Sequence, residues 1–155
     1  MFNKKNITIP VEVSARHCHL SLQDLEKLFG AGYKLKKLKQ LSQLSDFACE
    51  EAVTVQVGIK KFEKVRVVGP LREQTQVEIS LTDAVGSGVL PTVKLSGDLK
   101  GSSPVVLEGP NGKAELAEGL IEVRVKDDYK LCLHLDTDEG NSAGINKTGE
   151  GFILL

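Results

Sequence analysis

Hydrophobic and polar residues alternate in the opening segment of the chain. Every second residue from Ile7 to Val13 is apolar, and the residues between them are polar or, at position 10, proline. A period of two over seven residues predicts a β-strand. Pro10 predicts that this strand lies at a sheet edge, because proline cannot donate a ladder hydrogen bond.

The hydrophobic period changes after His19 and predicts a short helix. Ser21 has the character of an N-cap with acidic Asp24 three residues later, and Gly30 is a typical stop residue. The apolar stripe between these signals consists of Leu22, Leu25, Leu28 and Phe29.

From Tyr33 onward the chain has short alternating runs with glycine- and proline-containing turns between them. The clearest runs are Val53, Val55 and Val57; Val77, Ile79 and Leu81; and Leu131, Leu133 and Leu135. Many short strands at fairly regular spacing favour a small barrel or sandwich over a βαβ sheet. The expected fold class is mainly β with a few short helices, and Glu118-Gly119 is a candidate domain boundary.

The composition of the chain argues against several classes of function. The formal net charge of the 155-residue chain is -1, which argues against a protein that neutralises nucleic-acid or membrane phosphates. We see no apolar run of the about 20 residues that a membrane helix needs, and no signal-peptide core. Three cysteines without close spacing indicate a reducing compartment, so a cytoplasmic location is expected. Cys49 and Cys132 are expected to be buried small apolar residues.

His17-Cys18-His19 is the first cluster that could carry chemistry. On a strand, residues i and i+2 share a face, so both imidazoles could reach one ion while Cys18 points away. Zinc suits imidazole, and a carboxylate from elsewhere could complete three protein ligands with an open position. The alternative is a pair of hydrogen-bonded histidines at a strand end.

Arg72 and Glu78 form the second candidate group. If residues 75–81 form a strand, Gln76, Glu78 and Ser80 share the face opposite Val77. Arg72 precedes this strand, where its planar fork could hold a phosphate or carboxylate. The alternative is an exposed Arg and Glu on a hairpin.

His134 opens the third group, which continues into an acidic run over residues 136–139. His134 is expected to share its strand face with Cys132 and Asp136, away from the leucines. An EF-hand is excluded because its fifth and twelfth positions would fall on Gly140 and Lys147. A solvated acidic turn is the remaining interpretation. Among residues 34–39, four lysines form either a solvated face or a surface that steers a polyanion.

Several long segments, in order, resemble one family, the PduL-type phosphotransacylases (phosphate propanoyltransferases) of propanediol utilization. The matching segments are Val13-Ser14-Ala15-Arg16-His17-Cys18-His19-Leu20-Ser21, Val65-Arg66-Val67-Val68-Gly69-Pro70-Leu71-Arg72, Thr75-Gln76-Val77-Glu78-Ile79-Ser80, Ser96-Gly97-Asp98-Leu99 and His134-Leu135-Asp136-Thr137-Asp138-Glu139-Gly140-Asn141. The resemblance implies a tandem pair of small β-barrels. It also implies exchange of CoA and phosphate on a propanoyl or acetyl group, giving acyl phosphate, with two metal ions, normally zinc.

The resemblance also implies residue roles. His17, His19 and Glu78 correspond to the ligands of the first metal, and Arg72 corresponds to the phosphate-binding arginine. His134 corresponds to one ligand of the second metal. The positions that correspond to CoA contacts are Val13, Ser14, Ala15, Lys60, Arg66 and Asn141.

The chain departs from the family in one place. A second Arg-His-x-His motif is absent, and a few dozen family residues are missing between Val123 and Val125, so the second metal site is incomplete. Residues 15–119 are expected to form the first barrel, and residues 1–14 plus 120–155 a truncated remnant of the second. The alternative function is a degenerate paralogue that binds zinc or CoA without turnover.

The resemblance extends to partners and location. CoA, phosphate, short acyl-CoA and acyl phosphate are the implied partners, with no nucleic acid and no membrane, and assembly with further copies of the chain stays open. The N-terminal extension that directs some relatives to microcompartments is not expected here.

Overall fold

The computed structural model describes residues 7–90, 98–121 and 132–153. Its contacts divide the chain into two units. The larger unit is Arg16–Asp127, and the smaller unit joins Met1–Ala15 to Asp128–Leu155. Segments from the two halves of the sequence therefore belong to the same, smaller unit.

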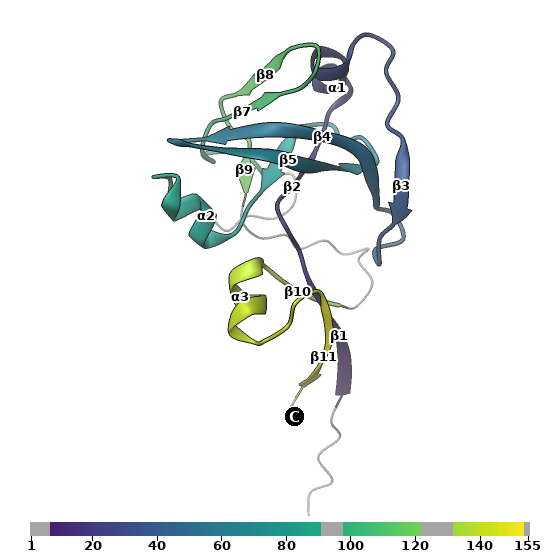
Figure 1. Ribbon diagram of the computed structural model, residues 1–155, viewed down its shortest axis with the longest axis vertical. Helices are drawn as coiled ribbons and strands as arrows, with labels where there is room; N and C mark the ends of the chain where they lie inside the picture. Colours follow the sequence, from purple (N-terminus) through teal and green to yellow (C-terminus); the bar gives the residue numbers. More distant parts are fainter. Residues whose placement is uncertain (1–6, 91–97, 122–131, 154–155) are drawn as a thin grey trace, which may run out of the picture. The chain divides into compact units, whose positions relative to one another are not determined.

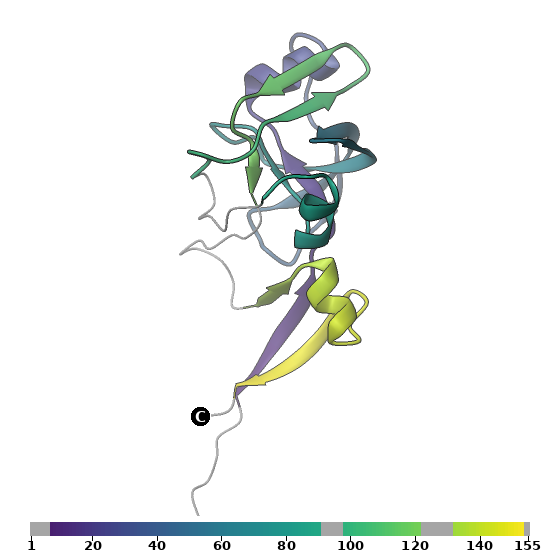
Figure 2. The ribbon, with the colours of Figure 1, turned by 90° about the vertical axis from the view of Figure 1, so that its left-hand side faces the viewer.

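An eight-stranded sheet forms the framework of the larger unit and curls on itself (Figures 1 and 2). The sheet order is β8-β7-β4-β5-β2-β6-β9, with β3 paired to β4 outside this path. The strands are β2 (His17–His19), β3 (Lys37–Gln40), β4 (Phe47–Val57), β5 (Lys60–Gly69), β6 (Gln76–Glu78), β7 (Val105–Glu108), β8 (Lys113–Leu116) and β9 (Leu120–Ile121).

The long β4–β5 hairpin sends one row of valines into the core. Val55, Val57 and Val67 are fully buried, as the alternating sequence predicts. Gly58 begins the turn at φ +50°, and a side chain there would collide with the carbonyl oxygen of Ser87. Glycine therefore fits this turn for two reasons, its left-handed backbone and the lack of space.

Helix α1 (Leu22–Phe29) confirms the predicted helix with its Ser21 N-cap and its end at Gly30. It packs beside the β7–β8 hairpin, where the Asn111 backbone N–H donates to the Leu28 carbonyl at 2.9 Å (Figure 2). The apolar face is narrower than predicted, because Leu22 is exposed while Leu28 is buried.

The strand expected to reach Leu81 ends earlier. β6 stops at Glu78, and helix α2 (Leu81–Gly86) follows. The side chain of Ser80 accepts a hydrogen bond from the Asp83 backbone N–H at 3.2 Å, which caps the helix. The apolar alternation continues into Leu81, but the cap ends the strand before it.

A three-stranded sheet in the order β10-β1-β11 forms the smaller unit. Its elements are β1 (Ile7–Val13), β10 (Leu133–Leu135), α3 (Thr137–Ser142) and β11 (Thr148–Ile153). β1 is therefore central and not an edge strand. The edge position predicted from Pro10 is correct only for the part of β1 before Val11, because β10 pairs with β1 from Val11 onward.

The expected acidic turn is the start of helix α3. Asp136 is its N-cap and accepts hydrogen bonds from the backbone N–H groups of Asp138 and Glu139, both at 2.8 Å. Glu139 in turn accepts from the Asp136 backbone N–H, which completes a capping box. The acidic residues thus cap a helix.

The mainly β fold with a few short helices is confirmed: eleven strands and three helices lie within the described residues. No helix among those residues is long and apolar enough to cross a membrane. The tandem barrels and the domain assignment stay predictions, and Leu131 and Val125 lie outside the described residues. Strand β9 follows the candidate boundary at Glu118-Gly119, yet it pairs with β6 in parallel and belongs to the larger unit.

A buried hydrogen-bond network ties α1 to the loop before β6. The Thr75 hydroxyl donates to the Asp24 carboxylate at 2.7 Å and accepts from the Ser21 backbone N–H at 2.9 Å. Burial alone would raise the pKa of Asp24, but hydrogen bonds from Thr75, Lys27 and Ser21 outweigh it and hold that pKa below its ordinary value.

Thr75→Val should therefore destabilise the fold in a pH-dependent way. We expect a loss of about 1–3 kcal/mol at pH 7, because buried partners lose a hydrogen bond. A lowered pKa gives stability that is present above the unfolded value of about 3.9 and lost as pH falls through the folded value. Urea unfolding at several pH values should show the difference from wild type narrowing below about pH 4.

Thr54→Val is the matched control, because Thr54 is only half-buried on β4. The loss of unfolding free energy in Thr54→Val should be small and independent of pH. A Thr75→Val difference that stays constant from pH 7 to pH 3 would contradict the role given to Asp24.

Candidate functional site

Two imidazoles and a carboxylate meet where β2 pairs with β6. The antiparallel register places His17 directly opposite Glu78 and His19 opposite Gln76. Nε2 of His17 lies 3.2 Å from Oε2 of Glu78, and Nε2 of His19 lies 3.6 Å from Oε1. The two rings lie edge to face with centroids 5.2 Å apart. The predicted sharing of one strand face by His17 and His19 is confirmed.

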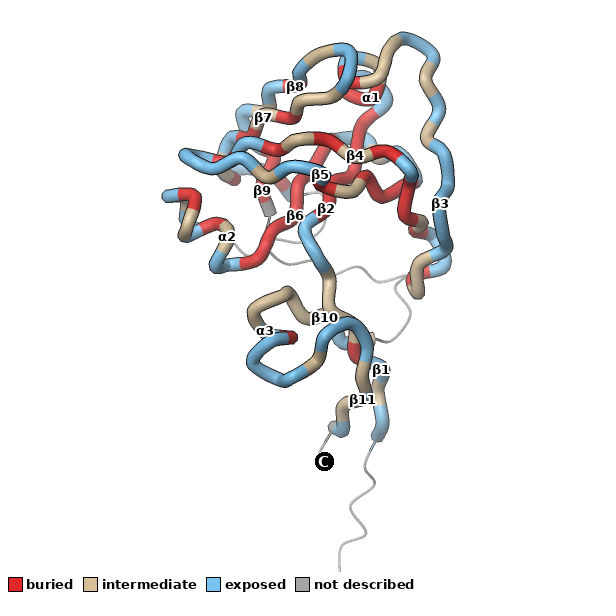
Figure 3. The backbone as a smooth tube through the Cα atoms, in the orientation of Figure 1, coloured by how far each residue is buried: buried red, intermediate tan, exposed pale blue. Residues whose placement is uncertain are grey.

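The cluster is buried. The exposed fractions of His17, His19 and Glu78 are 7%, 0% and 5%, and both strands are buried along their length (Figure 3). The Gln76 amide donates to Oε1 of Glu78 at 2.9 Å and so fixes the carboxylate. The sequence pattern predicts that Gln76 shares a face with Glu78, but it does not indicate that Gln76 positions the carboxylate. Cys18, between the histidines, is fully buried in the hydrophobic core.

This donor set fits a divalent metal ion. One nitrogen from each histidine and one carboxylate oxygen lie within 4.8 Å of one another. Two imidazoles and a carboxylate are a common protein ligand set for zinc that leaves a position open for a further ligand. Burying a carboxylate is costly, so a cation at this place would also offset the cost of burial.

Arg72 follows β5 and is held beside the end of β2. Its backbone N–H donates to the carbonyl of Leu20, the residue after His19, at 2.9 Å. Its guanidinium lies 3.7 Å from the carboxylate of Asp46, which is buried. The expected alternative, an exposed Arg on a hairpin, does not fit a side chain only 19% exposed. Asp46 was not a sequence candidate, since nothing in its local pattern links it to Arg72.

Lys60 is the first residue of β5, and Arg66 lies in the second half of the same strand. Arg66 lies opposite His17 in the parallel ladder, and its guanidinium donates to the carbonyls of Cys49 and Glu50, each at 2.9 Å. This bond pair supports the irregular pairing of β4 in that region. Lys60 is exposed, with its ammonium against Gly86 at the end of α2.

The other candidates belong to the smaller unit. Val13 ends β1, and the Ser14 backbone N–H donates to the Leu135 carbonyl at 2.8 Å. Asn141 is exposed on α3, and His134 lies on β10 beside Glu12 of β1. The candidate CoA contacts are thus divided between the two units.

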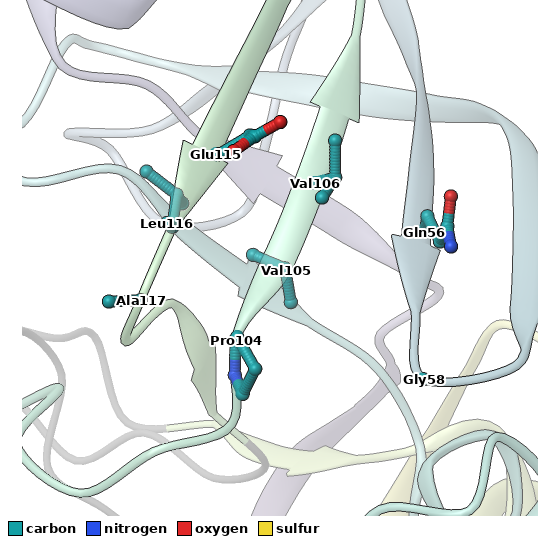
Figure 4. Close-up of a pocket in the computed structure, with 8 residues that line it drawn as sticks. All are labelled: Gln56, Gly58, Pro104, Val105, Val106, Glu115, Leu116 and Ala117. Carbon is teal, nitrogen blue, oxygen red and sulfur yellow. The ribbon is translucent and has the colours of Figure 1, made fainter.

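A cavity of about 520 Å³ lies over β4, β7 and β8 of the larger unit (Figure 4). Gln56, Val106 and Glu115 are among its lining residues. The lining includes none of the candidate site residues, so we assign this cavity no part in the site.

Comparison with known proteins identifies relatives over most of the chain. A model of the phosphate propanoyltransferase family matches residues 10–123. A phosphate propanoyltransferase of Priestia megaterium is 41% identical, with 97% of this chain and 87% of that protein covered. Phosphate propanoyltransferases of Thermotoga maritima and Clostridioides difficile are 40% and 37% identical, covering 95% and 93% of the chain and 89% and 88% of the relatives.

These alignments also measure the internal shortening. About 150 of the 155 residues take part in an alignment of 191 positions with the Priestia megaterium protein, so about 40 positions have no residue of this chain. The expected place of this gap, between Val123 and Val125, lies outside the described residues.

The three free thiols have different environments. Burial first, and then the nearby Cys49 and Glu78, raise the pKa of Cys18 well above its ordinary value. Burial and Glu51 raise the pKa of Cys49 to about 11. Cys132 is only half-buried, so the expectation that it is buried like Cys49 was wrong. The reason is its position just before the three-residue strand β10, on the face away from the leucines.

We expect one fast-reacting thiol in the folded, metal-free chain. A thiol with a pKa of about 11 is ionised in only about one molecule in a thousand at pH 8, and burial blocks access as well. An aromatic disulfide reagent should therefore modify Cys132 first and reach Cys18 and Cys49 only after unfolding. Cys132→Ser should remove the fast phase and Cys49→Ser should keep it; two fast thiols in the native protein would contradict this assignment.

Proposed function

The chain belongs to the phosphate propanoyltransferase family and is a phosphotransacylase, and we propose that its acyl transfer takes place at the buried cluster of His17, His19 and Glu78. The substrates in this proposal are propanoyl-CoA and phosphate, with acetyl-CoA as a second acyl donor. A phosphate oxygen forms a bond to the acyl carbon, the carbon–sulfur bond breaks, and CoA leaves as a thiolate, which gives acyl phosphate.

The observation that best supports this proposal is that three potential ligand atoms lie within 4.8 Å of one another at a buried position. We propose that His17, His19 and Glu78 hold zinc. A zinc ion bound there would supply Lewis acidity to the thioester carbonyl. Gln76 keeps the Glu78 carboxylate in position through its 2.9 Å hydrogen bond, so the ligand set is largely preorganised.

Arg72 is the proposed phosphate-binding residue. Its guanidinium is mostly buried and lies 3.7 Å from the carboxylate of Asp46, which keeps the planar fork beside the end of β2. Two parallel N–H donors match two phosphate oxygens, and holding phosphate in place turns a bimolecular attack into a positioned one.

The residues proposed to contact CoA are Val13, Ser14, Ala15, Lys60, Arg66 and Asn141. Lys60 and Arg66 carry the positive charge that the phosphates of CoA require. We propose that the larger unit corresponds to the first barrel, with residues 15–119, and that the smaller unit is what remains of the second.

Phosphate-dependent release of CoA tests the activity. The zinc-loaded chain should release CoA from propanoyl-CoA only when phosphate is present. Arg72→Ala should raise the KM for phosphate about 10–100-fold, the equivalent of losing a charged hydrogen-bond pair. Lys39→Ala, which removes an exposed charge on β3, is the control and should leave that KM within about twofold.

Metal-loaded protein without phosphate-dependent release would overturn the proposal. It would favour the alternative, a paralogue that binds zinc or CoA without turnover.

Metal retention tests the ligand assignment separately from activity. His17→Ala and Glu78→Gln should each lower the zinc content after dialysis by one ion per chain, because two remaining donors hold the ion weakly. Glu73→Gln changes an exposed carboxylate in the nearby loop and should retain the metal. Unchanged zinc content in both ligand variants would show that the ion binds elsewhere.

A further inference from the structure

A second group of ligand-type side chains lies in the smaller unit. Glu12, Cys132 and His134 each offer one donor atom, and these atoms lie within 4.8 Å of one another. We propose that they form a second metal site, with a thiolate, an imidazole and a carboxylate as ligands. The family resemblance gave a role only to His134, so the assignment of Cys132 and Glu12 comes from this geometry.

The backbone brings these three residues to one face. The parallel pairing of β1 with β10 places Glu12 directly beside His134, and Cys132 precedes His134 by two residues. Alternation along a strand turns all three side chains to the same side of the sheet.

The opposite face of this sheet is already occupied. Val13 and Leu135 lie on that face, and Gly140 of α3 packs closely against Val13. The three donors therefore lie on the face of the sheet that points away from α3.

The local geometry and charge suit a cation. Nε2 of His134 lies 3.6 Å from Oε2 of Glu12, and both side chains are 30% exposed, so an ion can reach them from solvent. Glu150 of β11 pairs with Pro10, two residues from Glu12, and adds a second negative charge to the same face. Cys132 is half-buried, unlike Cys18 and Cys49, so an ion can reach its sulfur.

The donor types select the kind of ion. Sulfur, nitrogen and oxygen donors together favour zinc or a similar borderline ion over calcium or magnesium, which prefer oxygen alone. Three protein ligands leave a fourth position open, as in catalytic zinc sites. Any part of this ion in acyl transfer rests on the proposed function, whereas its binding does not.

The thiolate makes this site distinguishable from the first. His17, His19 and Glu78 offer nitrogen and oxygen, and Cys18 between them points into the core. A thiolate-to-cobalt charge-transfer band in the near ultraviolet therefore reports on Cys132, while visible cobalt bands report on both sites.

Cobalt(II) titration of the full chain tests the inference. Wild type should bind two ions and develop the charge-transfer band. Cys132→Ser should lose the band and one ion, whereas His17→Ala should lose one ion and keep the band. No band in wild type, or a band that survives in Cys132→Ser, would overturn the site. If the second site is overturned in this way but the chain is active with metal in the first site alone, the proposed function still holds.

Two carboxylate variants separate ligation from general attraction. Glu12→Gln should weaken cobalt binding at the thiolate site at least about tenfold, since removing even an outer partner of a ligand has that effect. Glu150→Gln removes one charge from the same face and should change affinity less than about threefold. Equal effects of the two variants would overturn the assignment of Glu12. Circular dichroism of each variant, with Cys132→Ala as a second thiol variant, distinguishes lost ligation from lost folding.

Discussion

The antiparallel pairing of the short strands β2 and β6 is the constraint on which the candidate site depends. Each strand has only three residues, yet their register places His17 opposite Glu78 and His19 opposite Gln76. A slip of one residue would turn both histidines to the other face of the sheet. The register is fixed because Cys18 and Val77, on the opposite face, are fully buried in the core. Hydrophobic packing on one face thus sets the chemistry on the other.

Burying Glu78 between two imidazoles is costly unless each polar atom has a partner. The fold meets this cost locally: Gln76 donates to the carboxylate from the same strand, and the two histidines face it across the ladder. In the same way, the guanidinium of Arg66 donates hydrogen bonds to the carbonyls of Cys49 and Glu50 and so gives these backbone groups of β4 a partner. The polar groups around the site therefore also hold the strands that carry it.

The sequence predicted best what depends on local periodicity. The shared face of His17 and His19 and the capped helix α1 follow from spacing and cap residues alone. Two of the failures have a common cause: Ser80 and Asp136 cap short helices where apolar alternation and acidic composition predicted a strand and a turn. The central position of β1 and the partnership of Glu12 with His134 depend on pairing between the two ends of the chain, which no local pattern contains.

The lost positions change what a second metal could do. The chain lacks about 40 positions of its relatives, and among the described residues the β1–β10 ladder places Glu12 and Cys132 beside His134. A thiolate gives more electron density to zinc than an imidazole does, so the ion becomes a weaker Lewis acid. Such an ion suits binding a substrate sulfur or phosphate better than polarising a carbonyl. The stronger Lewis acid would then be at the thiolate-free cluster of β2 and β6, where we propose that acyl transfer takes place.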